Sequence, residues 1–138
     1  MSNQAETPTV AAPKGGLVTY LNIDGAIAAA DFYKRAFGAE IVAQQPADDQ
    51  GRTMHIHLQV NGSSFMLSDF FAEHGHAKVA PQGYSLVLMV KDIHNDFQRA
   101  VDAGATVVNA VYEGHGWRIG RIADPFGHHW EIGRPLAG

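Results

Sequence analysis

The first half of the chain alternates hydrophobic and polar positions in short runs around one helical pattern. Alternation predicts strands over residues 18–23, 39–44, 54–60 and 63–68. Between the first two runs, apolar residues recur at helical spacing and form one face, which comprises Ala29, Phe32, Tyr33, Ala36 and Phe37. The pattern therefore predicts a β-α-β-β-β unit.

Polar residues and glycines mark where these elements begin and end. We expect Asp24 to cap the helix, because its carboxylate can accept hydrogen bonds from the first free amides. Gly38 suits the left-handed position that ends a helix. Asn61-Gly62 predicts a type I′ turn, so the last two strands should form a hairpin.

The second half follows the same order. Strands are predicted over residues 85–90, 105–111, 117–123 and 128–132, with a helix between Asp92 and Gly104. Asp124-Pro125-Phe126-Gly127 matches a type I turn. Asp31-Phe32 recurs as Asp96-Phe97, and Gly38-Ala39 recurs as Gly104-Ala105. Such a repeat indicates two copies of one unit, each too small to bury its hydrophobic face alone.

The fold class expected from this pattern is α+β, with a ligand at the surface that the copies share. The first copy should span residues 17–69 and the second 84–133, joined by a connector over 70–83, so that 17–133 forms one domain. Residues 1–16 are predicted to be a flexible polar tail and 134–138 a second tail.

Composition and charge exclude several classes of function. A net charge of −4 without a Lys/Arg cluster argues against nucleic acid or an anionic membrane as partner. The absence of cysteine excludes disulfides and zinc-thiolate sites and fits a cytoplasmic protein. No apolar run approaches the roughly 20 residues that span a bilayer.

Five motifs in order carry a family resemblance. They are Tyr20-Leu21, Phe32-Tyr33-Lys34 with Phe37-Gly38-Ala39-Glu40, Met54-His55, Met66-Leu67-Ser68-Asp69, and Arg118-Ile119-Gly120 followed by Asp124-Pro125-Phe126-Gly127-His128 and Trp130. Together, from Leu17 to Ile132, they resemble the vicinal oxygen chelate superfamily of glyoxalases, bleomycin-resistance proteins and extradiol dioxygenases, and within it the PhnB-like branch. The resemblance implies a cup of curved mixed sheet with helices outside, a ligand on the concave faces, and a homodimer.

The resemblance also implies where a metal would be held. Metal-using members place His, Gln or Glu on the first and last strands of each copy. Here the matching last-strand positions are Glu131 and Met66, and the first-strand positions fall near Leu17 or Val18 and at Ser85. One ligand out of four does not hold a divalent ion, so we expect no usual metal site and no cofactor.

Alternation assigns further polar residues to the concave faces. His55, His57 and Gln59 should face away from the helix, because Met54, Ile56 and Leu58 alternate with them. His129 and Glu131 should share a face as well. A divalent metal held by Glu131 with His55, His57 or His129 stays a possible alternative to plain polar lining. Glu131 is also the best candidate for a catalytic base, unless it is hydrogen-bonded to a histidine.

The loop over residues 114–120 offers two more candidates. Trp117 could cover an apolar ligand, and Arg118 could hold a carboxylate or phosphonate. The alternative for Arg118 is a structural ion pair with Glu113. The predicted ligand-binding residues are therefore His55, His57, Met66, Met89, Trp117, Arg118, His129 and Glu131.

The function predicted from these residues is small-molecule binding without the usual metal, with a second copy of the chain as the other partner. Two alternatives remain at this point. One is a metal-dependent lyase, isomerase or dioxygenase that uses Glu131 with non-standard histidine ligands. The other is a non-catalytic interaction module whose cup is filled by its own side chains.

Overall fold

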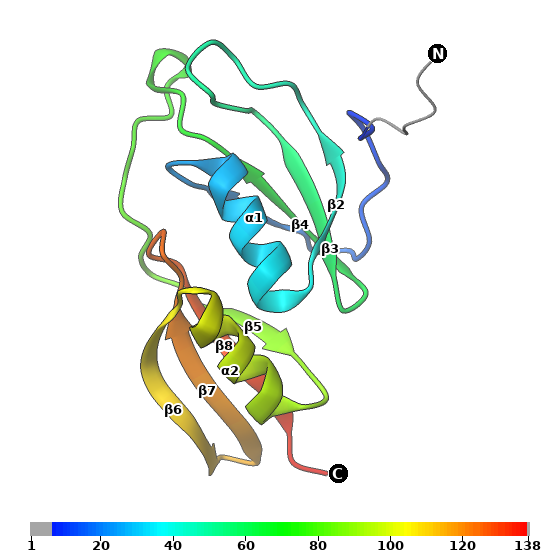
Figure 1. Ribbon diagram of the computed structural model, residues 1–138, viewed down its shortest axis with the longest axis vertical. Helices are drawn as coiled ribbons and strands as arrows, with labels where there is room; N and C mark the ends of the chain where they lie inside the picture. The colour runs from blue at the N-terminus through cyan, green and yellow to red at the C-terminus, as the bar shows by residue number, and fades with distance from the viewer. Residues whose placement is uncertain (1–6, 138) are drawn as a thin grey trace. The chain divides into compact units, whose positions relative to one another are not determined.

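The structure is a computed structural model in which residues 7–137 are described. The chain divides into two compact units, which Figure 1 shows as two sheets, each with a helix on it. The first comprises residues 1–34 and 39–78, and the second comprises 35–38 and 79–138. None of the helices formed by the described residues is long and apolar enough to cross a membrane.

The first unit contains a four-stranded mixed sheet. Its elements are β1 (Thr19–Asn22), α1 (Ala26–Phe37), β2 (Glu40–Gln44), β3 (Ile56–Val60), β4 (Ser63–Ser68) and the short 3₁₀ helix η1 (Ala72–His74). The strand order is β1-β4-β3-β2, with β1 parallel to β4 and the other pairs antiparallel. The first strand of the unit thus lies beside its last.

The second unit repeats this arrangement. Its elements are β5 (Leu86–Met89), α2 (Ile93–Ala103), β6 (Thr106–Gly114), β7 (Trp117–Ala123) and β8 (His129–Pro135). The strand order is β5-β8-β7-β6, and β5 is again parallel to β8. The predicted α+β class and the repeated β-α-β-β-β unit are confirmed. β6 and β8 extend further than predicted, because Trp117 pairs with both Gly114 and Pro135.

Each unit buries a core between its sheet and its helix. In the first unit, the ring of Tyr33 on α1 meets Phe65 on β4 edge-on, with centroids 5.5 Å apart. The buried strand residues on this face are Leu21, Ile56, Leu58, Phe65 and Leu67, and those of the second unit are Leu88, Ile122, Trp130 and Ile132. Alternation therefore leaves the other face of each sheet for polar residues.

Most predicted turns and caps are confirmed by the backbone. Asn61 and Gly62 have φ angles of 48° and 82°, as a type I′ turn requires. The amide of Gly127 donates to the carbonyl of Asp124 at 3.0 Å, which closes the predicted type I turn. The Asp92 carboxylate caps α2 by accepting from Asn95 N at 3.2 Å.

The predicted cap of α1 is wrong. Asp24 is exposed and forms an ion pair with Lys78, with 2.6 Å between Oδ2 and Nζ. The buried carboxylate of Asp69 takes the capping role instead: its Oδ1 accepts from Gly25 N at 2.9 Å and from Ala26 N at 3.0 Å. A cap from the end of β4 satisfies the free amides of α1 and also ties the helix to its sheet.

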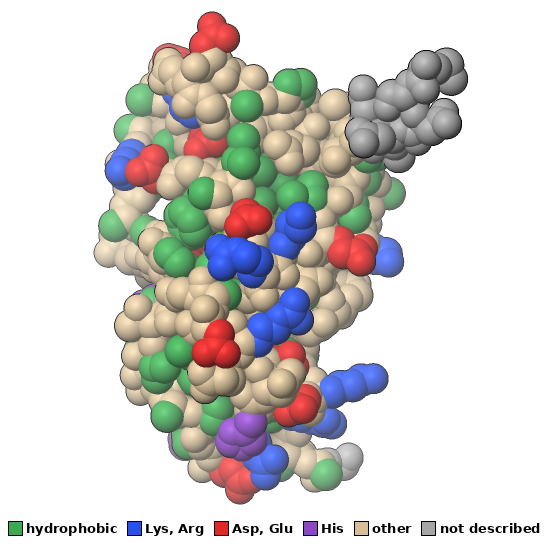
Figure 2. Space-filling model, viewed as in Figure 1, with side chains coloured by type: hydrophobic (Ala, Val, Ile, Leu, Met, Phe, Trp, Pro, Cys, Tyr) green, Lys and Arg blue, Asp and Glu red, His purple; other side chains and the backbone are tan. Residues whose placement is uncertain are grey.

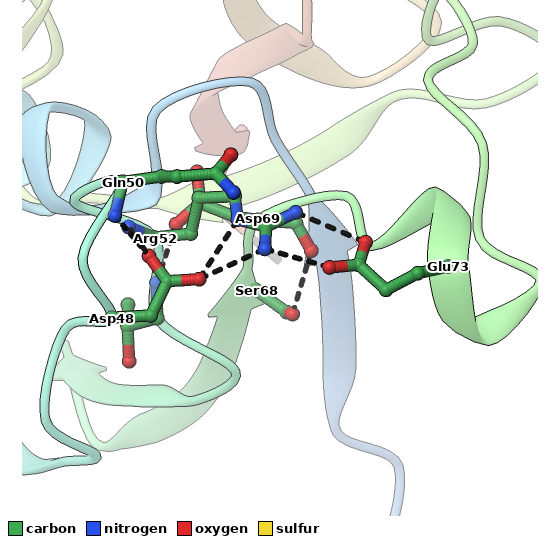
Figure 3. Close-up of polar contacts among 7 residues, drawn as sticks. Asp48, Gln50, Arg52, Ser68, Asp69 and Glu73 are labelled. Atoms are coloured by element: carbon green, nitrogen blue, oxygen red, sulfur yellow. Dashed lines mark hydrogen bonds and ion pairs between the residues drawn. The ribbon is translucent and has the colours of Figure 1, made fainter.

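Two irregular segments also pack on the first unit. In the connector, Glu73 on η1 binds Arg52, which in turn holds Asp48, and Figure 3 shows this network. Of the predicted flexible tail, residues 1–6 lie outside the described residues. Residues 8–14 make hydrogen bonds to the sheet, including Gln44 N to Pro8 O at 2.7 Å.

Candidate functional site

The two sheets present equivalent rows of residues on the faces opposite their helices. In the first unit, Tyr20 pairs with Met66, which pairs with His57. In the second, Val87 pairs with Glu131, which pairs with Arg121. Because residues paired in register point to the same side of a sheet, each row forms one strip of surface. The repeat therefore places His57 and Arg121 at corresponding positions.

In the second unit the row holds an ion pair. Glu131 Oε1 lies 3.3 Å from the guanidinium of Arg121, and Glu131 Oε2 accepts from Ser85 Oγ at 3.2 Å. About a third of the Arg121 side chain and 28% of that of Glu131 remain exposed. The structure places Arg121 and Ser85 at the Glu131 carboxylate, where a histidine had been considered. Arg121 was missed by the sequence reasoning, although counting outward from the turn at 124–127 pairs it with Glu131.

Apolar side chains flank this ion pair. Val87 is 51% exposed and Met89 is 46% exposed, and both lie on the Glu131 face of β5. His129, two residues before Glu131 on β8, is half-buried on the same face. A few convergent polar groups within a mostly apolar surface are the usual lining of a small-molecule site.

In the first unit the row holds uncharged hydrogen-bonding groups. His57 is fully buried, and its Nε2 lies 2.7 Å from Ser64 Oγ. The Tyr20 hydroxyl donates to Met54 O at 2.8 Å and lies 3.2 Å from His55 Nδ1. The rings of His55 and His57 have centroids 6.4 Å apart. The structure therefore brings these two predicted residues together.

Burial changes the acid–base properties of this cluster. It lowers the pKa of His57, and the neighbouring His55 lowers that pKa further by charge repulsion. Burial raises the pKa of Tyr20, while the hydroxyl of Ser68 opposes that rise. Both shifts favour the neutral forms of His57 and Tyr20, so these two side chains can offer hydrogen bonds to a polar ligand.

The predicted loop residues have different roles. Arg118 forms an ion pair with Glu113, and its Nε donates to Glu113 Oε1 at 3.0 Å. This is the structural alternative that the sequence left open. Trp117 is half-buried at the start of β7, beside the turn at His115 and Gly116.

A second polar network in the same unit was not predicted. The Tyr84 hydroxyl contacts His128 Nδ1, and Asp124 accepts from the amide of His128 at 3.0 Å and from Trp130 Nε1 at 2.9 Å. Burial, and then the charge of Asp124, raises the pKa of Tyr84. No sequence motif identifies Tyr84. It precedes β5 in the chain, and only the folded structure brings its side chain to the turn after β7.

A surface pocket of about 390 Å³ lies beside the Arg52 network in the first unit. The guanidinium of Arg52 stacks on Phe71 at 4.4 Å and forms paired hydrogen bonds with Glu73, which hold the pKa of Glu73 at about 2. Arg52 binds the carboxylates of both Asp48 and Glu73, so the network joins the β2–β3 loop to the connector (Figure 3). The pocket is lined by Gln45, Pro46, Asp48, Arg52, Met54, Phe71, Glu73 and His74.

The residues present do not provide a donor set for a divalent metal. Within residues 7–137, no three His, Asp or Glu side chains form a group that could hold a metal ion. Glu131 is bound to Arg121 and Ser85, and its counterpart in the first unit is Met66. A carboxylate already bound to a guanidinium and a thioether do not make a site for a hard divalent cation.

The fold and these faces define a protein of the glyoxalase type. The model of the Glyoxalase/Bleomycin resistance protein/Dioxygenase superfamily matches residues 17–132, and the chain belongs to this superfamily. An uncharacterised protein of Mycobacterium bovis is 40% identical over 128 residues, which cover 87% of this chain and 83% of that protein.

Solved structures share the fold. TioX from Micromonospora sp. ML1 matches with a TM-score of 0.70 and 27% identity, over 88% of this chain and 99% of that one. A glyoxalase-related enzyme from Fulvimarina pelagi matches with a TM-score of 0.67 and 28% identity, over 84% of each chain.

Proposed function

We propose that this protein binds a small organic molecule with an apolar body and a polar group, and that it does so without a divalent metal. The ligand lies on the helix-free face of a sheet, where the Arg121–Glu131 pair orients its polar group and Val87 and Met89 contact its apolar part. This combination of exposed apolar side chains and an ion pair on one strip is the observation that carries the proposal.

The same geometry assigns Glu131 a binding role. Each of its oxygens is engaged, one by Arg121 and the other by Ser85. An oxygen that accepts one hydrogen bond keeps a second lone pair for another donor. Glu131 therefore serves to hold the Arg121 guanidinium and to accept a hydrogen bond from a ligand.

Three further points belong to the same proposal. We place the chain in the PhnB-like branch, on the motifs from Tyr20-Leu21 to Trp130, and we expect a homodimer. We also expect it in the cytoplasm, an expectation that rests on the sequence. On the face displayed in Figure 2, acidic and basic side chains are interspersed, which supports a small molecule as partner in preference to nucleic acid.

The test uses the fluorescent probe anilinonaphthalene sulfonate, which combines an apolar body with an anionic group. We expect saturable binding by the untagged protein and about tenfold weaker binding by Met89→Asp, since the change removes an apolar contact and adds a like charge. Val79→Asp is the matched control, because Val79 is exposed in the connector, and it should bind as the wild type does.

Two outcomes would overturn the proposal. The first is equal binding by the Met89 and Val79 variants, since the probe would then not use this face. The second is a stoichiometric divalent ion in the untagged protein that is lost in Glu131→Ala but kept in His76→Ala. That result would favour a metal-dependent enzyme of the same superfamily.

A further inference from the structure

The buried state of His57 is unexpected for its position in the sheet. Ile56 and Leu58 on either side of it face the core, so the imidazole points to the opposite face. Its counterpart Arg121 keeps a third of its side chain exposed, whereas His57 has no exposure. Something other than the sheet and α1 must therefore cover His57.

The covering segment comprises residues 8–14, named here the strap. At one end, Gln44 N on edge strand β2 donates to Pro8 O at 2.7 Å. At the other end, Lys14 N donates to Ser64 Oγ at 2.7 Å, and Ser64 N donates to Lys14 O at 3.1 Å. Because β3 lies between β2 and β4, a segment bound at both ends must cross β3, the strand that carries His57.

The contacts of His57 show on which face the strap crosses. The backbone of Ala11, in the middle of the strap, lies at the imidazole and partly offsets the fall in its pKa. The hydroxyl of Ser64 joins the two, since it contacts both His57 Nε2 and Lys14 N. The strap therefore runs over the face that carries Tyr20, His57 and Met66.

The strap is held in a way that allows it to leave. Its described polar contacts are the hydrogen bonds at its two ends, one from Gln45 Nε2 to Thr9 O at 3.0 Å, and the backbone of Ala11 at the His57 imidazole. Among its side chains, Ala11 is half-buried and the others are exposed. A segment that buries little apolar surface and is held by a few hydrogen bonds opens at low cost.

We propose that residues 8–14 are a removable strap that covers His57 on the helix-free face of the first unit and competes with a small-molecule ligand for that position. The proposal rests on the proposed function and adds regulation to it. When the strap lifts, the face presents hydroxyl and imidazole groups to a polar ligand. When it is closed, His57 is covered, while Tyr20 on the same face stays 47% exposed. The corresponding face of the second unit keeps Val87 and Met89 exposed.

The test compares a locked and a loosened strap in the full chain. Pro8→Cys with Gln44→Cys places two thiols where the backbones already pair, in a chain that has no other cysteine. Lys14→Pro removes the amide that binds Ser64, and Ala12→Pro is the matched control, because Ala12 is exposed and outside the strap's hydrogen bonds.

The first measurement is the titration of the His57 imidazole by NMR, with exposed His94 on α2 as internal reference. We expect the pKa of His57 to rise in Lys14→Pro, because burial is the main cause of its low value. The pKa should stay low in the oxidised cysteine variant and in Ala12→Pro. An unchanged His57 in Lys14→Pro, with the protein folded, would show that the strap does not cover it.

The second measurement is binding of anilinonaphthalene sulfonate to the cysteine variant, oxidised and then reduced. Every arm also carries Met89→Asp, because this change weakens binding of the probe at the exposed face of the second unit. If the strap is open in about one molecule in ten, a probe that needs the open state binds about tenfold more weakly than to a permanently open face. Reduction should therefore restore the binding that oxidation removes. Equal binding in both states of this variant, or no binding in either state, would overturn the competition. Absence of saturable binding by the wild type would overturn the proposed function, and the His57 titration decides separately whether the strap covers the imidazole.

Discussion

The sharpest test of the fold concerns the two aspartates that compete for the role of helix cap. Asp69 is buried, and its carboxylate accepts from Gly25 N and Ala26 N through Oδ1 and from Thr53 N through Oδ2 at 2.8 Å. It thereby joins the start of α1 to the segment before β3. Asp24, the residue expected from the sequence, instead forms an ion pair of which both side chains are about two thirds exposed.

The magnitude follows from the number of hydrogen bonds lost. Asp69→Asn keeps one carbonyl oxygen for α1 but turns an amide group toward Thr53 N, so one hydrogen bond to a charged group is lost, worth about 1.5–3 kcal/mol. Asp69→Ala leaves several amides without partners and should cost more than about 3 kcal/mol. Asp24→Ala should cost less than about 0.5 kcal/mol, because exposed ion pairs contribute little, whereas loss of an N-cap carboxylate would cost about 0.5–2 kcal/mol.

The assay is urea unfolding followed by far-UV circular dichroism, with midpoints compared at equal slope. The expected order of destabilisation is Asp69→Ala, then Asp69→Asn, then Asp24→Ala. If Asp24→Ala costs as much as Asp69→Asn, the helix is capped as the sequence alone predicted, and the inference from the hydrogen bonds of Asp69 is refuted.

Two further predictions concern the two units separately. The pKa of Glu73 is about 2 in the folded state against an ordinary 4.5. Its pairing with Arg52 therefore stabilises the folded protein fully at pH values above 4.5. The stability difference between wild type and Glu73→Gln should therefore be constant at neutral pH and shrink as pH falls from 4.5 toward 2; urea midpoints across this range measure it, and a constant difference at pH 2 would contradict it. In Gly120→Ala, the added Cβ would lie 2.5 Å from Cε2 of Phe97, which should cost about 1–3 kcal/mol in thermal unfolding. Phe97→Leu in the same chain should recover part of that loss, and no recovery would argue against this contact as its cause.

Elements whose signals are local could be predicted from the sequence. The helical face around Phe32 and Tyr33 and the Asn61-Gly62 turn depend on residues within a few positions of one another, and the structure shows them as expected. The repeat indicated that the two halves contain the same unit, and the structure gives both the same strand order. These signals were sufficient for the fold class, whereas the superfamily was indicated by the five motifs.

Features that join distant parts of the chain could not be predicted in this way. Asp69 caps a helix that begins more than forty residues earlier, and no pattern near Asp24 indicates that the cap comes from elsewhere. The strap is held by hydrogen bonds of its backbone and does not depend on an apolar face. Its sequence therefore shows no alternation of hydrophobic and polar residues. Arg121 is an intermediate case, since its pairing with Glu131 follows from the turn once the turn is known.

The candidate site is found where the two copies stop being alike. At corresponding positions the first unit has His57 and Met66 and the second has Arg121 and Glu131, although the backbone pairing around them is the same. The fold does not require this difference, since both sheets have the same strand order. One copy thus keeps a neutral strip under a strap, and the other keeps a charged pair open among apolar side chains. A ligand that is largely apolar but carries one polar group satisfies the open strip, because its polar group can share the hydrogen bonds of the ion pair without requiring that the pair be broken.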